Sequence, residues 1–217
     1  MKKEVGLLLV DEYILLALFF AICIVLFRKY LRPAPHSFSA NPGTYVIGKN
    51  IPPGKYDLVA HAGTGDFCIL ECNAIDWHPP HKLGMEGDDC TRCFRNVTLK
   101  KGDTLEINGS LHIKTRIPAP IKNVTLEPLD PGNYKIGSDI LPGTYNLEVL
   151  SGKGQVYTTV TGQEGNPFFQ EMAKDDKTLA KTFENLELTD ETQLFVRGSL
   201  SLKLTPAPGV PRWRWMS

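Results

Sequence analysis

The chain of 217 residues lacks a net charge, because its 24 lysine and arginine residues equal its 24 aspartate and glutamate residues. Without a surplus of either sign, no strong electrostatic field steers it toward nucleic acid or toward an anionic membrane surface. We therefore expect no nucleic-acid partner.

Long amphipathic helical periods are missing as well. The chain contains 19 glycines and 16 prolines, which favour turns and short strands over helices. In stretches such as 104–107, 111–114 and 200–204, apolar residues take every second place. Strands with this alternation bury one face and expose the other, as in an antiparallel sandwich or jelly roll. The sequence thus predicts an all-β fold.

Motifs that carry catalytic chemistry are also absent. No glycine-rich loop follows a strand and opens a helix, so nothing supports nucleotide binding. A thiol nucleophile such as Cys68 or Cys93 with His61 lacks a third group to orient the pair. The acidic doublets at 88–89 and 175–176 offer too few oxygen ligands at set spacing for calcium. We expect a protein without enzymatic activity.

One apolar run is long enough to concern a membrane. Residues 13–27 contain no charge and no helix breaker, and shorter apolar stretches extend the run to 5–31. A spanning helix needs about 20 apolar residues, and the flanking Arg28 and Lys29 can snorkel. Basic residues directly after the run count against a cleaved signal peptide. We predict a single-pass membrane anchor at 5–31; a cleaved signal and a buried soluble helix are the alternatives.

Downstream of this run, one stretch of sequence occurs twice at an offset of 89 residues. Residues 42–58 and 131–147 are identical at ten of seventeen positions, without a gap. The same offset aligns later stretches, and an unbroken register over about 70 residues indicates a duplicated folding unit. We predict two tandem homologous antiparallel modules of the sandwich or jelly-roll kind, preceded by one transmembrane helix.

The predicted organisation has six parts. In order they are an anchor helix at 5–31, a proline-rich stalk at 32–41, β module 1 at 42–117, a linker at 118–130, β module 2 at 131–205 and a basic, aromatic tail at 206–217. Strands are predicted in both modules: 44–48, 54–60, 65–72, 93–99, 104–108, 111–116, 133–137, 143–150, 154–160, 182–188, 193–197 and 200–205. Asn108-Gly109 between two alternating runs predicts a hairpin turn, and its counterpart Arg197-Gly198 keeps only the glycine.

Two segments carry a resemblance to known proteins. Residues 132–145 read Gly-Asn-Tyr-Lys-Ile-Gly-Ser-Asp-Ile-Leu-Pro-Gly-Thr-Tyr, and residues 96–109 read Asn-Val-Thr-Leu-Lys-Lys-Gly-Asp-Thr-Leu-Glu-Ile-Asn-Gly. They resemble the two halves of a recurrent bacterial module, although Asn50 replaces an aspartate in the first copy and Glu191-Thr192 replace Gly-Asp in the second. The resemblance implies a lipoprotein or membrane-anchored envelope protein. It carries over no catalytic residue, because the motif consists of turn glycines and core positions.

The two copies differ most between residues 61 and 93, where only the first contains cysteine or histidine. Cys90 and Cys93 have the spacing of zinc ligands, and Cys72, His78 or His81 would complete a tetrahedral site. A four-cysteine site is disfavoured, because Cys68 and Cys72 would lie roughly 13 Å apart in one extended strand. A zinc site at Cys72, His78, His81, Cys90 and Cys93 is therefore one interpretation.

Two disulfides are the interpretation that we favour, and free thiols are a third. If the strand at 65–72 pairs antiparallel with a strand that starts near residue 90, Cys72 faces Cys90 and Cys68 comes near Cys93. Such a bridge would stabilise a small domain by about 2–4 kcal/mol. Disulfides require an oxidising compartment, whereas metal-bound or free thiols require a reducing one.

These observations lead to one expected function and two alternatives. We expect a non-enzymatic protein of the bacterial cell envelope, anchored in the membrane, with extracytoplasmic β modules that bind a protein or a glycan and with no cofactor. The count of basic residues around 5–31 leans by one residue toward cytoplasmic modules instead. The alternatives are a zinc-binding or thiol-redox protein that uses the cysteine and histidine cluster, and a structural subunit of a membrane complex. The arginines and tryptophans of residues 212–215 suit a membrane interface or a partner groove.

Overall fold

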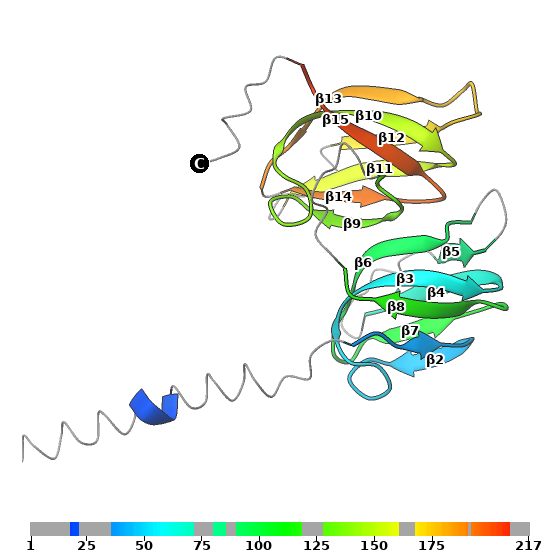
Figure 1. The fold of residues 1–217 in the computed structure, drawn as a ribbon, viewed down its shortest axis with the longest axis vertical. Coiled ribbons are helices and arrows are strands. Elements are labelled where there is room, and N and C mark those ends of the chain that lie inside the picture. The colour runs from blue at the N-terminus through cyan, green and yellow to red at the C-terminus, as the bar shows by residue number, and fades with distance from the viewer. Residues whose placement is uncertain are drawn as a thin grey trace, which may run out of the picture. The chain divides into compact units, whose positions relative to one another are not determined.

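The structure, a computed structural model, describes residues 18–21, 36–71, 80–85, 90–118, 128–160, 168–190 and 192–208. The chain divides into two units, Met1–Ala34 and Pro35–Ser217. The described residues of the second unit form β-strands joined by turns, which confirms the all-β prediction (Figure 1).

In the first unit, the described residues are four helical ones, Leu18, Phe19, Phe20 and Ala21, and all four are exposed. No helix within the described ranges is both long and apolar enough to cross a membrane. The other residues of the predicted anchor at 5–31 lie outside the described residues, as do 119–127 of the linker and 209–217 of the tail.

The strands fall into two groups along the chain. Those of residues 36–118, called the first half below, are β1 (Ser39–Ala40), β2 (Gly43–Val46), β3 (Gly54–Ala62), β4 (Thr64–Leu70), β5 (His81–Gly84), β6 (Cys93–Leu99), β7 (Thr104–Ile107) and β8 (His112–Arg116). Those of residues 128–208, the second half, are β9 (Gly132–Lys135), β10 (Gly143–Ser151), β11 (Lys153–Val160), β12 (Phe168–Ala173), β13 (Thr182–Leu188), β14 (Thr192–Val196) and β15 (Ser201–Pro206). Each predicted strand is present, with ends within two residues of those predicted.

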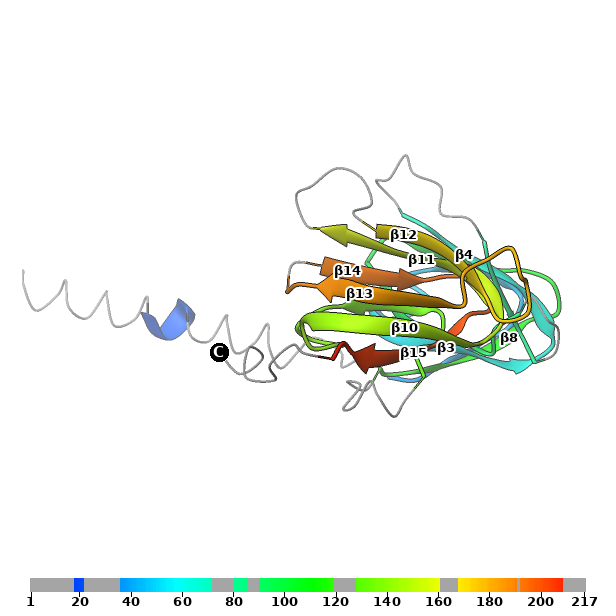
Figure 2. The same ribbon diagram turned by 90° about the horizontal axis from the view of Figure 1, so that it is seen from above.

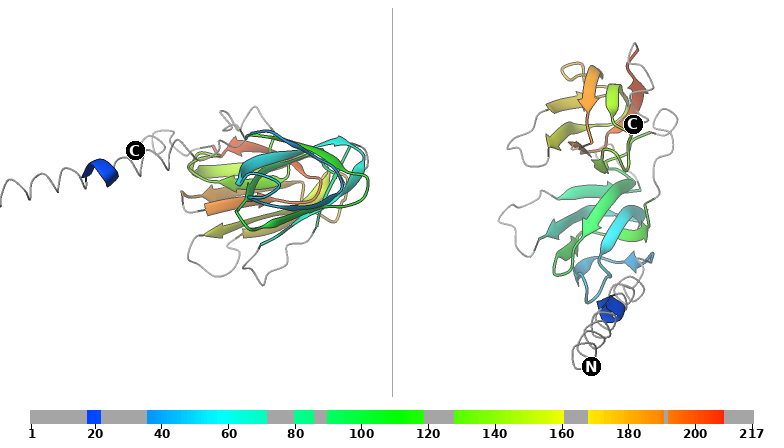
Figure 3. Two further views of the ribbon diagram at one scale, coloured as in Figure 1. Left: turned by 90° about the horizontal axis from the view of Figure 1, so that it is seen from below. Right: turned by 90° about the vertical axis from the view of Figure 1, so that its left-hand side faces the viewer.

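Three sheets are formed by these strands (Figures 2 and 3). A four-stranded sheet has the order β2-β7-β4-β5, and a three-stranded sheet has the order β13-β10-β15. An eight-stranded sheet, β1-β8-β3-β6-β9-β14-β11-β12, runs through both halves. The two halves meet in it at β6 and β9, which pair in parallel at Arg95 and Gly132, whereas the other paired strands are antiparallel.

Each half has its own hydrophobic core, built from inward-facing residues of both of its sheets. The core of the first half includes Leu58, Phe67, Leu105 and Ile113, and that of the second includes Leu147, Val156, Leu194 and Leu202. All eight side chains are almost fully buried. Because the alternating strands point these residues inward, burial of their apolar area is the main term that stabilises each half.

The predicted hairpin at Asn108-Gly109 is wrong. The strands on either side of it, β7 and β8, lie in different sheets and do not pair with each other. Gly109 has a φ of 76°, and a Cβ atom there would lie 2.8 Å from the carbonyl oxygen of Thr64. Glycine is therefore required for a tight turn that carries the chain from one sheet to the other, past β4.

The pairings of β3 with β6 and of β10 with β13 follow the same register, displaced by 89 residues. Gly54 pairs with Leu99, and Gly143 pairs with Leu188. Both pairings contain a bulge, which includes Asn96 on β6 and Asn185 on β13, whose φ angles are 58° and 59°. In each bulge a side-chain oxygen accepts the freed backbone N–H: Asp57 Oδ1 lies 2.9 Å from Asn96 N, and Asn146 Oδ1 lies 3.0 Å from Asn185 N.

This pair of bulges leads to a stability prediction. Asn146 accepts the corresponding hydrogen bond with a neutral amide oxygen, so Asp57→Asn keeps the required acceptor. We expect this substitution to change the free energy of unfolding by less than about 1 kcal/mol. Asp57→Ala leaves the buried N–H of Asn96 without its partner and is expected to cost about 1–3 kcal/mol. Urea unfolding of both variants checks this, with Asn146→Ala as the matched change in the second half. Equal losses for both Asp57 variants would show that the charge matters and not the acceptor.

Four tyrosines close the turns that precede or begin strands. Each hydroxyl donates to the carbonyl oxygen four residues earlier: Tyr45 to Asn41 (2.9 Å), Tyr56 to Pro52 (3.0 Å), Tyr134 to Asp130 (2.5 Å) and Tyr145 to Leu141 (2.8 Å). The rings pack in or against the cores, and each hydroxyl group supplies a donor to a turn carbonyl that needs one.

Candidate functional site

A groove lies where the two halves meet. Strands β4, β5 and β6 supply one wall, and β9 and β14 supply the other. Its volume is about 390 Å³, and the residues that line it include Phe67, His81, Phe94, Gln193, Phe195 and Arg197. This size falls in the range of natural ligand sites, and the mixture of rings and planar polar groups makes it the best candidate for a binding site in the described part of the chain.

An aromatic cluster forms the wall from the first half. The ring centroids of Phe67 and Phe94 are 5.3 Å apart at an interplanar angle of 77°. His81 lies 5.3 Å from Phe67 and 4.5 Å from Phe94. Both phenylalanines are buried, whereas His81 is partly exposed. The edge-to-face pair anchors the wall in the core and leaves the imidazole ring at the surface of the groove.

Arg197, at the end of β14, forms the centre of the opposite wall. Its Cζ atom lies 5.3 Å from the ring centroid of Phe94, 5.4 Å from that of Tyr157 and 5.0 Å from that of Phe195. Tyr157 and Phe195 are cross-strand neighbours on β11 and β14 and stack at 4.8 Å. Strand pairing thus places two rings side by side, and the guanidinium lies against both of them and against a ring of the other half.

The hydrogen-bond partners of this guanidinium are neutral oxygens. Nη1 donates to the carbonyl oxygens of Gly132 (3.0 Å) and Val196 (3.1 Å), and Nη2 donates to Asn133 Oδ1 (2.8 Å). These bonds hold Arg197 to β9 and orient the guanidinium plane. They do not neutralise its charge.

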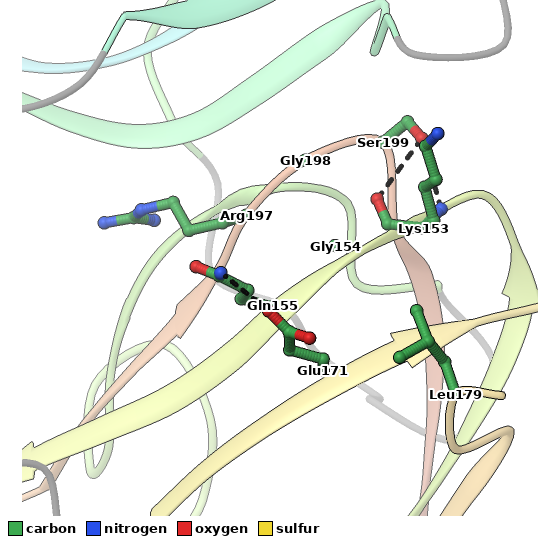
Figure 4. A pocket seen from close by; sticks show the side chains of 8 residues that line it. All are labelled: Lys153, Gly154, Gln155, Glu171, Leu179, Arg197, Gly198 and Ser199. Atoms are coloured by element: carbon green, nitrogen blue, oxygen red, sulfur yellow. Dashed lines mark hydrogen bonds between the residues drawn. The ribbon is translucent and has the colours of Figure 1, made fainter.

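Burial lowers the pKa of Arg197 from its ordinary value, although an arginine stays protonated at neutral pH. Among the described residues no carboxylate forms an ion pair with it. The nearby Glu171 is hydrogen-bonded to Gln155, and Figure 4 shows the guanidinium directed away from Glu171. A desolvated cation with neutral partners favours an anionic group in its surroundings.

At the rim of the groove, Lys100 Nζ lies 3.3 Å from Glu71 Oε2. Lys100 is exposed, so solvent screens its charge and it contributes little to the field inside the groove. Among the described residues that line the groove, Arg197 is thus the largely buried cation that a bound acidic group would meet.

A second pocket, of about 530 Å³, is lined by both Cys90 and Cys93, together with Arg116 and Asp130. Cys93 is buried, and its sulfur accepts a hydrogen bond of 3.7 Å from Arg116 Nη2. The pKa of the Cys93 thiol is raised to about 11, chiefly by burial and further by the charges of Asp57 and Asp130, against a lowering effect of Arg116. Cys93 is therefore a neutral thiol at physiological pH and a weak nucleophile.

The strand pairing from which we predicted disulfides is wrong. Strand β4 pairs with β5 and β7, and β6 pairs with β3. Cys68 consequently lies opposite Glu106, with Sγ 3.5 Å from Glu106 Oε2, and not beside Cys93. Because β4 and β6 belong to different sheets, the predicted approach of Cys68 to Cys93 does not occur. Cys68, Cys90 and Cys93 are free thiols in the structure, and Cys72 lies outside the described residues.

The residues proposed as zinc ligands are not gathered either, as far as they are described. His81 lines the aromatic groove, whereas Cys90 and Cys93 line the second pocket. In the described ranges no group of three or more histidine, cysteine, aspartate or glutamate side chains is arranged to hold a metal ion. Cys72 and His78 fall outside these ranges.

The pKa of Cys93 leads to a prediction about pH. The folded thiol ionises at about 11 and the unfolded thiol near its ordinary value of 9.0. Between these values the unfolded chain has lost the proton that the folded chain retains, so the stability due to Cys93 is present below pH 9 and lost as pH rises. The loss is expected to reach about 2–3 kcal/mol near pH 11. Urea unfolding from pH 8 to 11 measures it as the difference between the native chain and Cys93→Ala; parallel curves would contradict the prediction.

Arg197, Phe195 and Tyr157 were not identified as site residues from the sequence. Arg197 was noted only as the counterpart of Asn108 in a turn. The sequence did contain a sign of the site, namely the change from Asn108 in the first copy to Arg197 in the second. This change places a cation two positions after Phe195, on the same face of the strand. Comparison with protein-family models and with curated proteins finds no match for this chain.

Proposed function

We propose that this chain is a non-enzymatic protein of the bacterial cell envelope that binds an acidic glycan. It is held in the membrane by residues 5–31, and its binding site is the groove between its two halves. The observation that carries the proposal is the largely buried guanidinium of Arg197, which lies against three rings and has neutral hydrogen-bond partners.

The groove offers what a charged sugar requires. Partly exposed faces of Phe195 and His81 suit the C–H surfaces of a pyranose ring. Gln193 and Thr98 are exposed on opposite walls, where they can pair with sugar hydroxyl groups. A carboxylate on the sugar would be the anionic partner that Arg197 does not find among the described residues. A groove that is open at the surface also suits one part of a long chain.

The proposal includes the finer architecture, namely two homologous sandwich modules at 42–117 and 131–205. Three observations support a duplication: the equal registers of β3–β6 and β10–β13, the paired bulges at Asn96 and Asn185, and the four matched tyrosine hydrogen bonds. A duplicated module provides two similar walls, and divergence between them at the contact provides the site.

Calorimetric titration of the full chain, kept in detergent, tests the binding. A hexuronic-acid oligosaccharide is expected to bind, and the corresponding neutral hexose oligosaccharide is expected to bind at least about tenfold more weakly, since one charge-assisted hydrogen bond contributes about 1.5–3 kcal/mol. Gln193→Ala is expected to weaken binding about threefold to tenfold. The matched control is Gln170→Ala, on β12 and outside the groove. Absence of binding to both sugars, or equal losses for both glutamine variants, would refute the assignment.

Location is tested separately, by protease protection on intact cells. Cleavage within 42–205 without lysis is expected if the β modules are extracytoplasmic. Full protection would favour the cytoplasmic alternative, and cross-linking through residues 5–31 to one stoichiometric partner would favour a subunit of a membrane complex.

A thiol-redox function is the second candidate, because Cys90 and Cys93 line the same pocket. Intact-mass measurement with and without reductant, together with metal analysis, distinguishes it. A mass decrease of two hydrogen atoms on oxidation that maps to these two cysteines would favour redox chemistry, and one stoichiometric zinc would favour the metal site.

A further inference from the structure

The joint between the two halves is a contact between strand edges. The backbone N–H of Arg95 on β6 donates to the carbonyl oxygen of Pro131, at 2.8 Å, and Arg95 pairs with Gly132. A Cβ atom on Gly132 would lie 2.6 Å from the carbonyl oxygen of Arg95, so only glycine permits this approach. Arg95 Nε also lies 3.3 Å from Asp130 Oδ2. The edge of β6 therefore accepts a strand that begins Pro-Gly-x-Tyr.

At the offset of 89 residues, β6 corresponds to β13 and β9 corresponds to β2. One edge of β13 and one edge of β2 pair with no described strand. Among the described strands, β13 pairs only with β10, and β2 pairs only with β7. Figure 1 shows β6 and β9 facing each other where the halves meet, whereas β13 and β2 lie at the outer ends of the second unit. The chain thus has one uncovered edge of the β6 kind, on β13, and one of the β9 kind, on β2.

Side-chain exposure follows the same division. Phe94 on β6 and Tyr134 on β9 are 3% and 1% exposed. Their counterparts Phe183 on β13 and Tyr45 on β2 remain partly exposed, and both pack against the edges of their cores. The residues that the joint covers in one pair of strands are therefore uncovered in the other pair.

The strand that would fill the vacant edge of β13 is present in the chain itself. Residues 42–45 read Pro-Gly-Thr-Tyr, which matches Pro-Gly-Asn-Tyr at 131–134. An added Cβ atom on Gly43 would meet no atom within 4 Å except those of Tyr45. The close approach that Gly132 permits inside the chain is thus also available at Gly43.

We propose that copies of this chain associate head to tail, with β2 of one copy pairing in parallel with β13 of the next. The contact repeats the internal joint between β6 and β9, and it uses a different surface on each partner. Such a contact does not close on itself as a twofold dimer, so it builds either rings or open chains of copies. Addition of a strand to an exposed edge is an established mode of recognition, and it covers an edge that would otherwise remain available for unspecific pairing.

This contact is expected to be weaker than the joint inside the chain. Glu184 corresponds to Arg95 and Asn41 corresponds to Asp130, so the ion pair of the joint is missing between copies. The ion pair of 2.8 Å between Lys55 and Asp139 is also missing between copies, because Thr144 and Asn50 occupy the corresponding positions. Association is therefore expected to depend on concentration, and the pair Asn41 and Glu184 offers a means to change its strength.

Sedimentation velocity of the full chain in detergent, over a series of concentrations, tests the proposal. Asn41→Asp places a second negative charge beside Glu184 and is expected to weaken association about twofold to fivefold. Combined with Glu184→Arg, the same substitution recreates the ion pair of the joint and is expected to tighten association about twofold to fivefold over the native chain. Aspartate keeps the acceptor that His112 Nδ1 contacts at 2.9 Å, so the turn is preserved.

Glu148→Arg, an exposed charge reversal on the central strand β10, is the control and is expected to leave the association constant unchanged. Self-association through the apolar run at 5–31 would not respond to residues 41 and 184. A mass independent of concentration, or equal association of the native chain, Asn41→Asp and the double variant, would overturn the proposal.

Discussion

Replacing Leu105 or Leu194 with alanine is expected to destabilise the protein by about 2–5 kcal/mol. These leucines occupy matched positions on β7 and β14 and are fully buried, each in the core of its own half. Each substitution removes apolar contacts and leaves a cavity, because packed sheets collapse only partly. Since domains have only about 5–15 kcal/mol of stability, either loss is a large fraction of the total.

Urea unfolding measures both losses, and hydrogen exchange locates them. Because the cores are separate, Leu105→Ala is expected to raise exchange mainly in the first half and Leu194→Ala mainly in the second. Leu141→Ala, at a side chain that is 62% exposed, is the control and should change stability by less than about 0.5 kcal/mol. A loss below about 1 kcal/mol for either buried leucine would contradict this description of the cores.

Replacing Arg197 with methionine is expected to cost about 3 kcal/mol. Methionine keeps much of the contact with Phe94 and Phe195, but it donates no hydrogen bond. The carbonyl oxygens of Gly132 and Val196 and the side chain of Asn133 each lose a charged donor. Because two of these acceptors belong to β9, which borders β6, the joint between the halves should loosen as well.

Arg197→Lys is expected to lose less than the methionine variant, since it keeps the charge but not the forked geometry. Chemical unfolding gives the size of the loss, and hydrogen exchange at residues 132–135 reports on the joint. The exposed Lys203→Met on β15 provides the control. If Arg197→Met is as stable as the native chain, the cost of desolvating the guanidinium offsets all of its contacts, and Arg197 is not a structural residue.

The alternating pattern of Leu105 to Ile107 and of Leu200 to Leu204 was enough to predict strands, and proline and glycine were enough to place the turns between them. These are local properties, because a side chain two residues along a strand returns to the same face and a glycine permits its own φ. Strands β1, β5 and β12 were not predicted. Strand β1 lies in the predicted stalk and pairs with β8. Strands β5 and β12 lie in the segments where the two copies diverge. All three complete sheets that other strands begin, so their pairing depends on residues distant in sequence.

The two wrong predictions share one cause. Asn108-Gly109 has the composition of a hairpin turn but connects two sheets, and the cysteines of β4 and β6 lie on strands that do not pair. Both errors assumed that consecutive strands are neighbours in one sheet. Which sheet a strand joins is decided by the packing of both sheets around the core, and no short sequence pattern carries that information.

By itself, the sequence determined the all-β class, the positions of twelve strands and the 89-residue offset that relates its two halves, because turn chemistry and alternation act over a few residues. Tertiary structure decided which strands pair, that Cys68 faces Glu106, and that Arg197 lies among Phe94, Tyr157 and Phe195. The physical reason is that these contacts join strands far apart in the sequence, so they exist only after the sheets and both cores have formed.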